Sequence, residues 1–381
     1  MRRRNRRVGN SVSEMWEMDI RNPASTSSVS RVAVLKTSPE DVLRDYSRVM
    51  RAVNYSSAFG RERKIVIKLN LSWTLFYPAC STPPWQLEGV LKTLIEDGYT
   101  DIEAVENKTV VTSPTKGAVN NKWLPVLEKY GKKFTPLTDV EWIRYQPKTP
   151  LSVLDSKVFD EVVIPRMLVG TNILHLPTQK THGHSTTTGA MKNAFGGLLR
   201  EARHHCHTYI HEVLVDLLSI QKEIHPGMLA VMDGTVAGDG AGPRTMDPKI
   251  ENFILASTDQ VAIDAVSAKM MGFDPMQIGY IKMAHDRGLG IGDPDQIEIV
   301  GEDISSVNYH FSVARSPVIY GDQCVRKGPL RLFEPLLHTK LFIFPRLASE
   351  IYHDYYWYPL KGKYKVREFM LTPWGKLFQQ Y

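Results

Sequence analysis

The sequence predicts an α/β protein in which helices cover both faces of a mostly parallel sheet. Short apolar segments of strand length alternate with longer helical segments from residue 31 to about residue 305. The segment 171–177 has the apolar, branched character of a buried strand and is closed by a proline. A chain of 381 residues can form one large unit or two medium domains. We expect two lobes, 31–160 and 161–305, around a cleft.

In the first lobe, a strand at 31–36 precedes a helix at 39–54, whose start is marked by Ser38 and Pro39. A second strand follows at 64–71, and Gly98 stops the next helix. The remaining elements up to residue 176 are expected as helices at 85–98 and 121–132 and strands at 101–106, 159–165 and 173–176.

The second lobe continues the alternation. A helix is expected at 212–221, followed by a strand at 228–233. Ser257 or Thr258 caps a helix at 260–271, which Gly272 ends. A strand at 298–301 closes the domain.

The two ends of the chain depart from this pattern. Residues 1–30 are Ser-rich and begin with five arginines among the first seven positions, so we expect a disordered basic leader. Residues 306–381 interleave aromatic and basic side chains without alternation, which predicts an irregular, aromatic-rich C-terminal arm. Such a composition suits a membrane–water interface or a nucleic-acid surface. It also suits packing on the same domain or a homo-oligomer contact, so peripheral membrane contact and oligomerisation through 331–381 both stay open.

Composition argues against several classes of protein. Cys80, Cys206 and Cys324 are far apart and lack Cys-x-x-Cys spacing, which disfavours a disulfide framework and a ferredoxin-type cluster. No window approaches the ~18 consecutive apolar residues of a spanning helix. Because no apolar stretch follows the leading arginines, we expect a cytoplasmic protein. The basic residues form no recognition module, so nucleic-acid binding is disfavoured.

Chemistry-bearing side chains concentrate between residues 175 and 211. Seven of the twelve histidines fall there, with two lysines, two arginines and four consecutive hydroxyl residues. The segment follows the strand 171–177, and ligands of open α/β sheets bind beyond the carboxyl ends of strands. We expect the lysine and histidine side chains of this segment to surround an anion.

Lys68 and Asn70 end the apolar strand 64–71. A lysine that alternates with isoleucines is costly inside a protein unless it is paired. If this strand end opens on the cleft that holds Lys180, two ammonium groups face one anionic ligand. In the alternative, Lys68 reaches solvent, and the sequence does not decide between the two.

His204, His207 and His211 share one face of a helix because they are spaced by three and then four residues. Such a face can bind zinc, nickel or copper. However, the spacing matches no defined signature, and His205 lies outside it. A polar face that contacts the Lys180 segment is the preferred interpretation, with a metal site as the alternative.

The segment 233–243 leaves a strand and is rich in glycine, so several positive φ angles are expected. Free amides near Gly240 and Gly242 would then cradle a phosphate or carboxylate. The segment lacks the Gly-x-Gly-x-x-Gly order and a Walker lysine, which disfavours a plain nucleotide loop. Asp233 is a candidate base or ligand contact, or it simply makes turn hydrogen bonds.

Asp264 is a carboxylate in an apolar run of small residues within the predicted helix 260–271. A buried carboxylate either pairs with a cation or has a raised pKa. Lys180 and Lys192 are the candidate partners, which makes Asp264 a candidate catalytic residue.

Taken in order along the chain, these segments resemble a widespread prokaryotic family known as domain of unknown function 362. The resemblance covers residues 31 to about 305. The matching residues are Lys68 with Asn70, Lys180-Thr-His182 with Thr188, Lys192-Asn193 with Gly196, the loop from Asp233-Gly234 to Gly242-Pro243, Asp259 with Asp264, and Gly272-Phe-Asp-Pro275.

The resemblance implies no general reaction. Many members of the family resemble iron–sulfur proteins with ferredoxin-type cysteines after the domain, which implies redox roles. The layout is also similar in outline to that of the nickel-pincer lactate racemases. This chain departs from the pattern, because Cys324 is the lone cysteine of its C-terminal region. An iron–sulfur cluster would therefore come from a redox partner, and any metal ion or cofactor stays unidentified.

These expectations predict an enzyme that binds a small anionic substrate, carboxylate or phosphate. His182 is the expected general acid or base, assisted by Lys180 and Asp264. The expected substrate contacts are Lys68, Asn70, Thr188, Lys192, Asn193, Arg200, Asp233, Gly240 and Gly242. The reaction would be a proton or hydride transfer, the latter with an external cofactor or partner. The alternative is a non-catalytic ligand-binding or assembly protein that docks a membrane or protein partner through its C-terminal arm.

Overall fold

The computed structural model of the protein describes residues 30–109 and 111–381. The basic leader expected at 1–30 therefore lies, except for its last residue, outside the described residues. The strands are β1 Arg31–Lys36, β2 Ile65–Lys68, β3 Ile102–Glu106, β4 Lys133–Pro136, β5 Trp142–Arg144, β6 Val163–Pro165, β7 Asn172–His175, β8 Thr178–His182, β9 Thr186–Thr188, β10 Met228–Ala241, β11 Thr245–Ser257 and β12 Glu298–Gly301. The α-helices are α1 Val42–Ala52, α2 Tyr55–Ala58, α3 Pro84–Glu96, α4 Pro114–Asn120, α5 Trp123–Lys129, α6 Ala190–Leu198, α7 Ile210–Ile224, α8 Gln260–Met271, α9 Gly279–Asp286, α10 Pro317–Arg326, α11 Ile343–Glu350, α12 Lys363–Leu371 and α13 Pro373–Gln379.

A ten-stranded sheet forms the centre of the molecule, in the order β12-β1-β11-β10-β7-β2-β3-β4, with β8 beside β10 and β9 beside β8. The antiparallel neighbours are β1 with β11, β10 with β11, and β8 with β9, and the other pairs are parallel. The predicted mostly parallel sheet is confirmed. It continues across residue 160, because β1 from the first expected lobe pairs with β11 and β12 from the second.

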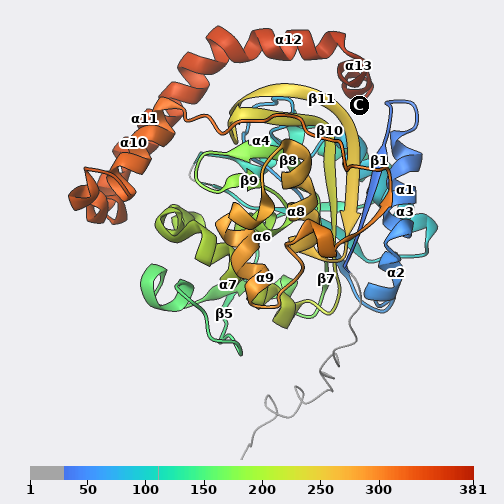
Figure 1. Ribbon diagram of the computed structural model, residues 1–381, viewed down its shortest axis with the longest axis horizontal. Helices are drawn as coiled ribbons and strands as arrows, with labels where there is room; N and C mark the ends of the chain where they lie inside the picture. Colours follow the sequence, from blue (N-terminus) through green and yellow to red (C-terminus); the bar gives the residue numbers. More distant parts are fainter. Residues whose placement is uncertain (1–29, 110) are drawn as a thin grey trace, which may run out of the picture.

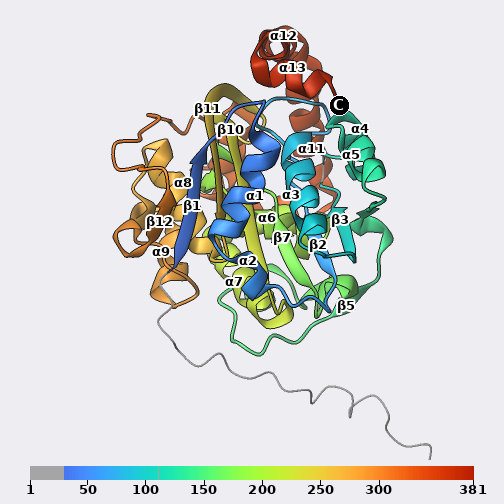
Figure 2. The same cartoon turned by 90° about the vertical axis from the view of Figure 1, so that its right-hand side faces the viewer.

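Helices cover both faces of this sheet, as predicted (Figures 1 and 2). Helices α1 and α3 pack on one face together with Ile65 and Ile67. Helices α6 to α9 pack on the other face, where Val66 lies. Because strand side chains alternate, Lys68 shares the face of Val66 and lies beneath α6, where a Cβ on Gly196 would be 3.1 Å from its Nζ.

The segment 233–243 forms no loop with several positive φ angles, so that prediction is wrong. It continues β10, which pairs antiparallel with β11 as a long hairpin. Of its glycines only Gly240, with φ +99°, has a left-handed backbone. The glycine content instead permits close approach, since a Cβ on Gly242 would lie 1.8 Å from the Thr181 carbonyl oxygen.

The N-cap of α8 also differs from the prediction. Asp259, and neither Ser257 nor Thr258, caps the helix by accepting from the amides of Val261 and Ala262 at 2.8 and 3.1 Å. Ser257 Oγ donates instead to the Arg31 carbonyl at 2.7 Å and so ties this turn to β1. A carboxylate is favoured at this position by the positive end of the helix dipole.

The C-terminal region is helical, whereas the sequence predicted an irregular arm. After α10, the chain forms short 3₁₀ turns at Arg331–His338 and Lys340–Phe342, α11, a π-helical segment at Ile351–Gly362, α12 and α13. Pro335 and Pro359 lie inside helical segments, and prolines usually mark helix ends. Figure 1 shows this region projecting from one side of the α/β body and crossing its top. Within residues 30–109 and 111–381, no helix is long and apolar enough to cross a membrane.

The last helix anchors the C-terminal region on the body. The Trp374 side chain is buried, and its Nε1 donates to Asn252 Oδ1 at 2.7 Å. Its ring lies 5.2 Å from the ring of Trp85 in α3, and Phe378 stacks on Phe76 at 3.9 Å. These contacts join α13 to the face of the sheet that α1 and α3 cover.

Replacing Trp374 by alanine is expected to lower the free energy of unfolding by about 3–5 kcal/mol, because it leaves a large cavity in this core. The matched control is Leu371→Ala in the same region, where the side chain is 77% exposed and the expected change stays within ~0.5 kcal/mol. Urea unfolding curves measure both changes. Equal losses for the two variants would contradict the anchoring role.

Candidate functional site

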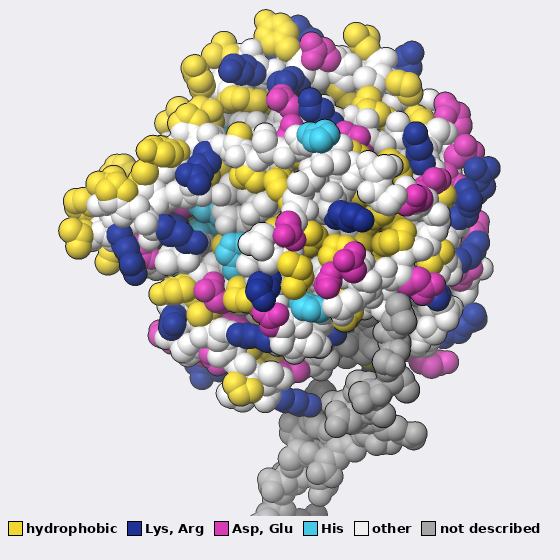
Figure 3. Space-filling model, viewed as in Figure 1, with side chains coloured by type: hydrophobic (Ala, Val, Ile, Leu, Met, Phe, Trp, Pro, Cys, Tyr) yellow, Lys and Arg dark blue, Asp and Glu magenta, His cyan; other side chains and the backbone are white. Residues whose placement is uncertain are grey.

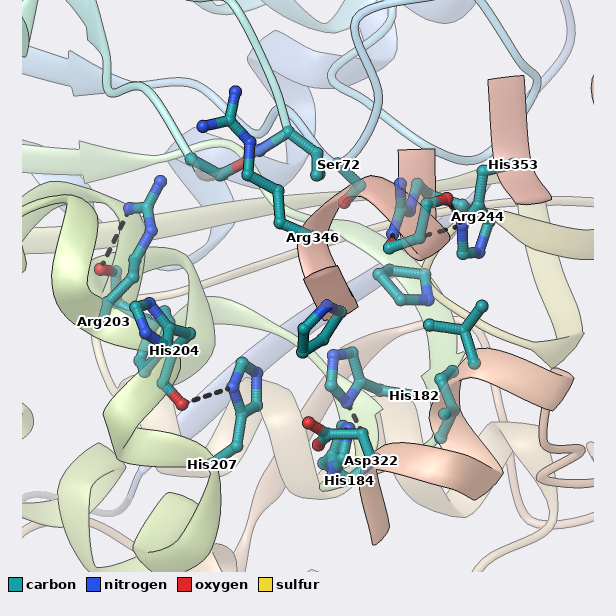
Figure 4. A pocket seen from close by; sticks show the side chains of 18 of the residues that line it. Ser72, His182, His184, Arg203, His204, His207, Arg244, Asp322, Arg346 and His353 are labelled. Atoms are coloured by element: carbon teal, nitrogen blue, oxygen red, sulfur yellow. Dashed lines mark hydrogen bonds and ion pairs between the residues drawn. The ribbon is translucent and has the colours of Figure 1, made fainter. Parts of the chain in front are cut away.

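A cavity of about 630 Å³ lies between the α/β body and the C-terminal region. The carboxyl ends of β2 and β3, the β8–β9 turn and α6 form one side of it, and α10, α11 and the turns between them form the other. Its lining includes six Lys or Arg residues and two carboxylates, a formal excess of four positive charges with the histidines neutral. Figure 4 shows Arg203, Arg244 and Arg346 around the same space as His182, His184 and His207.

Lys68 enters this site as a buried ion pair. Its Nζ donates to Glu106 Oε1 at 2.8 Å and to the Leu69 carbonyl at 2.6 Å. Burial lowers the pKa of Lys68, and the Glu106 carboxylate partly offsets this effect. The second carboxylate oxygen, Glu106 Oε2, is buried and has no hydrogen-bond partner among the described residues. Lys68 is buried, so the expectation that it reaches solvent is wrong. Lys68 and Asn70 both line the cavity, but Lys180 does not, so the two ammonium groups do not face one ligand space.

Lys180 lies behind the cavity wall and braces it. The side chain is fully buried, and its Nζ donates to Asn70 Oδ1 at 2.7 Å, to the Cys80 carbonyl at 3.0 Å and to Thr178 Oγ1. Burial lowers the pKa of Lys180 to about 7. With all three donors of an ammonium group used by protein acceptors, Lys180 positions Asn70 rather than contacting a ligand.

Lys192 is a second lysine of the cavity lining. It is on α6, and its Nζ lies 5.1 Å from the centre of the Phe195 ring. Burial and the neighbouring Arg203 guanidinium lower the pKa of Lys192 to about 8. Asn193, the next residue, also lines the cavity, but its Nδ2 donates to the Lys68 carbonyl at 2.9 Å. The two adjacent motif residues therefore have different tasks.

His182 and His207 face the cavity as opposite tautomers. His182 Nδ1 accepts from the His184 amide at 3.1 Å, so its proton is on Nε2. His207 Nδ1 lies 3.1 Å from the His204 carbonyl, which only accepts, so its Nε2 carries a lone pair. Burial, and then nearby cations and histidines, holds the pKa of both rings well below the usual range. Both imidazoles are therefore neutral at pH 7.

The C-terminal region closes this site through α10. Asp322 lies 3.5 Å from His184 Nε2 and accepts from Arg326 Nε at 2.8 Å. Gln323 donates to the Gly183 carbonyl at 2.7 Å. The ring of His184 is 4.8 Å from that of His207, so α10 is in direct contact with the histidine cluster.

Several predicted site residues are not in the cavity. Arg200 is exposed, with its guanidinium 5.4 Å from the ring centre of Trp142. Asp233 is buried elsewhere and accepts from Tyr46 Oη at 2.6 Å and Trp85 Nε1 at 3.0 Å. Burial raises the pKa of Asp233 to about 6. Asp233 is not among the residues that line the cavity.

Asp264 is likewise structural. It accepts from the amides of Ala190 and Met191 at 2.6 and 3.1 Å and so holds the start of α6, instead of pairing with either lysine. Burial raises its pKa to about 7.

The remaining candidate site residues make hydrogen bonds to backbone carbonyls. Thr188 Oγ1 donates weakly to the carbonyls of Thr178 and Lys180 within the sheet. The amide of Gly242 donates to the Gly240 carbonyl at 2.9 Å, so these glycines offer no free amide cradle. Their neighbour Arg244 does line the cavity, with its pKa lowered to about 10 by burial.

The predicted metal face is not assembled. His204 stacks on Phe342 at 3.6 Å, His207 turns to His184, and His211 Nδ1 accepts from the Tyr280 amide. Among residues 30–109 and 111–381, no group of three or more His, Cys, Asp or Glu side chains converges as a metal site.

The cysteines do not fit an iron–sulfur cluster either. All three are free, and burial raises the pKa of Cys80 and Cys206 to about 12, which disfavours the thiolate that a metal requires.

Three sets of residues that line the cavity were missed in the sequence analysis. Glu106 ends β3, which pairs with β2 so that Val105 lies beside Lys68. A carboxylate at the end of the strand next to a buried lysine was a usable signal of an ion pair. Asp322 and Arg326 show the i, i+4 spacing of a helical ion pair. Arg346 and His353 gave no signal, because their approach depends on how the C-terminal helices dock.

Comparisons with known proteins agree with the sequence resemblance. The family described as Domain of unknown function (DUF362) matches residues 65–269, more than half of the chain. Among curated proteins, Thylakoid-associated protein sll1697 of Synechocystis sp. is 28% identical over 182 residues. That alignment covers 46% of this chain and 52% of the relative, so the chain spans about half the length of the protein that it matches.

At pH 7 the imidazole ¹⁵N spectra of His182 and His207 are expected to show opposite neutral tautomers, Nε2–H for His182 and Nδ1–H for His207. The hydrogen bonds described above fix each tautomer. Long-range ¹H–¹⁵N spectra of histidine-labelled protein, assigned with His182→Gln and His207→Gln, measure them. The exposed His310 lies outside the cavity and serves as the reference signal. Titration of either cavity ring between about pH 5 and 8 would contradict this assignment.

Proposed function

Because the chain belongs to the family described as Domain of unknown function (DUF362), whose name assigns no reaction, we propose its function from the residues of its cavity. The protein is an enzyme that binds a small anionic substrate, carboxylate or phosphate, and transfers a proton within it. The observation that carries this proposal is that one cationic cavity is lined by two neutral imidazoles of opposite tautomer and by the ammonium group of Lys192.

Anion binding is supported by the charge of the lining. Glu106 and Asp322 are already engaged by Lys68 and Arg326, at 2.8 Å in each case. Lys192, Arg244 and Arg346 therefore add positive charge that the cavity's own carboxylates do not balance. In a site shielded from water, such charge attracts an anion more strongly than it does at an exposed surface.

Proton transfer is supported by the two histidines. A bound anion would raise the pKa of His207, which burial and nearby cations hold low. The lone pair of its Nε2 can then accept a proton from one atom of the substrate, as a general base does, and return the same proton to another atom. The Nε2–H of neutral His182 can donate a hydrogen bond to an oxygen on which negative charge develops, a role that neutral imidazole serves in other enzymes. The ammonium of Lys192 would balance the charge of the bound anion. A hydride transfer would need a cofactor or redox partner from outside the chain.

Acetate affinity is expected to be highest below about pH 8 and to fall above it, because Lys192, with a pKa of about 8, then loses its charge. A bound anion raises this pKa, so binding at pH 8 should take up protons. Lys192→Gln is expected to weaken binding about tenfold or more and to abolish the pH dependence. Isothermal calorimetry in buffers of different ionisation enthalpy measures both quantities.

The control for this experiment is Lys116→Gln, which removes an exposed lysine on α4 and should leave affinity and proton uptake unchanged. Acetate stays ionised over the whole range, so its own titration does not interfere. Unchanged affinity in Lys192→Gln would sink the proposed anion site.

A second function, docking on a membrane surface, is proposed for the C-terminal region. Large apolar side chains are exposed along it, among them Leu332 at 91%, Tyr355 at 73% and Phe344 at 64%. In Figure 3 hydrophobic side chains gather over the projecting part of the molecule that these helices form. Lysines and arginines at 361, 363, 365 and 367 are interleaved with them, which suits the headgroups of anionic lipids.

The relative's name is consistent with this second proposal, since that protein is called thylakoid-associated. A test by deleting 331–381 would be ambiguous, because Leu337 and Phe342 of this region also line the cavity. Point substitutions on the outward side separate docking from ligand binding.

Phe344→Asp is expected to reduce binding to vesicles of phosphatidylcholine and phosphatidylglycerol about tenfold, because it removes apolar burial and adds a repelled charge. Vesicle co-sedimentation measures the binding, which should also weaken with added salt. Val119→Asp, at a 55% exposed apolar position on α4, is the control and should bind like the wild type. Failure of the wild type to sediment with anionic vesicles would rule out this docking.

A further inference from the structure

We propose that the ligand of the cavity is an amphiphile, with an anionic head at the β8–β9 turn and an apolar tail against the C-terminal helices. This inference rests on the proposed anion site and specifies the class of its substrate. It follows from the size of the cavity, from the uneven distribution of polar and apolar side chains over its lining, and from the position of the apolar side chains in the fold.

The cavity is too large for a small anion alone. Its volume of about 630 Å³ is roughly twenty times the ~30 Å³ that one water molecule occupies in the liquid. It falls within the usual range of ~300–1,000 Å³ for pockets that bury a drug-sized organic molecule. A phosphate or acetate at Lys192 would leave most of this volume unfilled.

The polar and apolar side chains of the lining are unevenly divided between two parts of the chain. Lys68, Glu106, Lys192 and Arg203 come from the α/β body and its loops. The opposite wall comes from α10, α11 and the turns between them, and it is richer in apolar side chains although it also carries Asp322, Arg326 and Arg346. Its apolar side chains include Val318, Ile319, Val325, Leu337 and Phe342. An apolar group against this wall would be shielded from water while its charged end met the cations.

The apolar wall continues onto the outer surface of the same segment. Leu337 faces inward and is 8% exposed, whereas Leu336 beside it is 44% exposed. Phe342 stacks on His204 inside the cavity, while Phe344, two residues on, is 64% exposed. A segment with apolar side chains on two sides can contact a bilayer outside and an acyl or similar tail inside.

The test is a series of straight-chain carboxylates from acetate to decanoate, with 1-decanol as the uncharged control, bound to the full chain and followed by calorimetry. Affinity is expected to rise with chain length by up to about fourfold for each added methylene, and decanoate should bind at least tenfold more tightly than 1-decanol. Comparing the affinities of decyl phosphate and decanoate then shows whether the site prefers a phosphate or a carboxylate head.

Val325→Asp places a charge in the apolar wall and is expected to remove the dependence of affinity on chain length. Leu332→Asp is its matched control, since it adds the same charge to the same region at an outward position. This control should keep the full dependence. Equal effects of the two substitutions would show adsorption to the outer surface and overturn the proposed tail site.

The wild-type series separates the failure of this inference from that of the anion site, whether or not Val325→Asp folds. Acetate and decanoate of equal affinity, both tighter than 1-decanol, would overturn the tail site and leave the anion site. Decanoate and 1-decanol of equal affinity would overturn the anionic head, and with it both proposals. Absence of binding by every probe would do the same.

Discussion

The buried amino group of Lys180 is the constraint on which the rest of the site depends. A lysine charge is costly to remove from water unless hydrogen bonds replace its hydration. Here Asn70, Thr178 and the Cys80 carbonyl surround Nζ. Because these acceptors belong to the loop after β2, to β8 and to the turn before α3, one side chain fixes the relative positions of three segments. Losing any of these acceptors would leave a buried donor unsatisfied.

A polar network carries this constraint from Lys180 to the cavity. Asn70 Nδ2 donates weakly to Asn193 Oδ1 at 3.4 Å, and Asn193 in turn donates to the Lys68 carbonyl. Asn193 is on α6, directly after Lys192, so the network sets the height of the helix over the sheet. Asp264 fixes the same helix at its first turn. These buried hydrogen bonds thus position Lys192 beside the ligand space.

The predictions from sequence succeeded where the signal is local. The strand 31–36, the helix 260–271 and the strand 298–301 are confirmed at both ends, because alternation and capping are local signals. The β10–β11 hairpin was missed, since its glycines serve close packing against Thr181 rather than turns. The helical C-terminal region was missed because its internal prolines are typical of helix ends.

The candidate site was predicted in composition but not in arrangement. Lys68, Asn70, His182, Lys192 and Asn193 do come together along the cavity lining. Sequence cannot tell a residue buried behind the cavity wall from one that faces the ligand, because both kinds are polar side chains at strand ends or helix starts. Lys180 and Asp264 were therefore misjudged. Burial and hydrogen-bond partners decide such cases, and both depend on the complete fold.

The cationic and the apolar parts of the cavity lining come largely from the family domain and from the segment that follows it, respectively. The cations and histidines that would hold an anion lie mostly within residues 65–269, which match the family. The apolar wall lies in 317–348, beyond that match. On the proposals above, residues of the matched domain would hold the anionic head of a ligand. The C-terminal helices of this chain would set the length of its tail and the surface on which the protein docks.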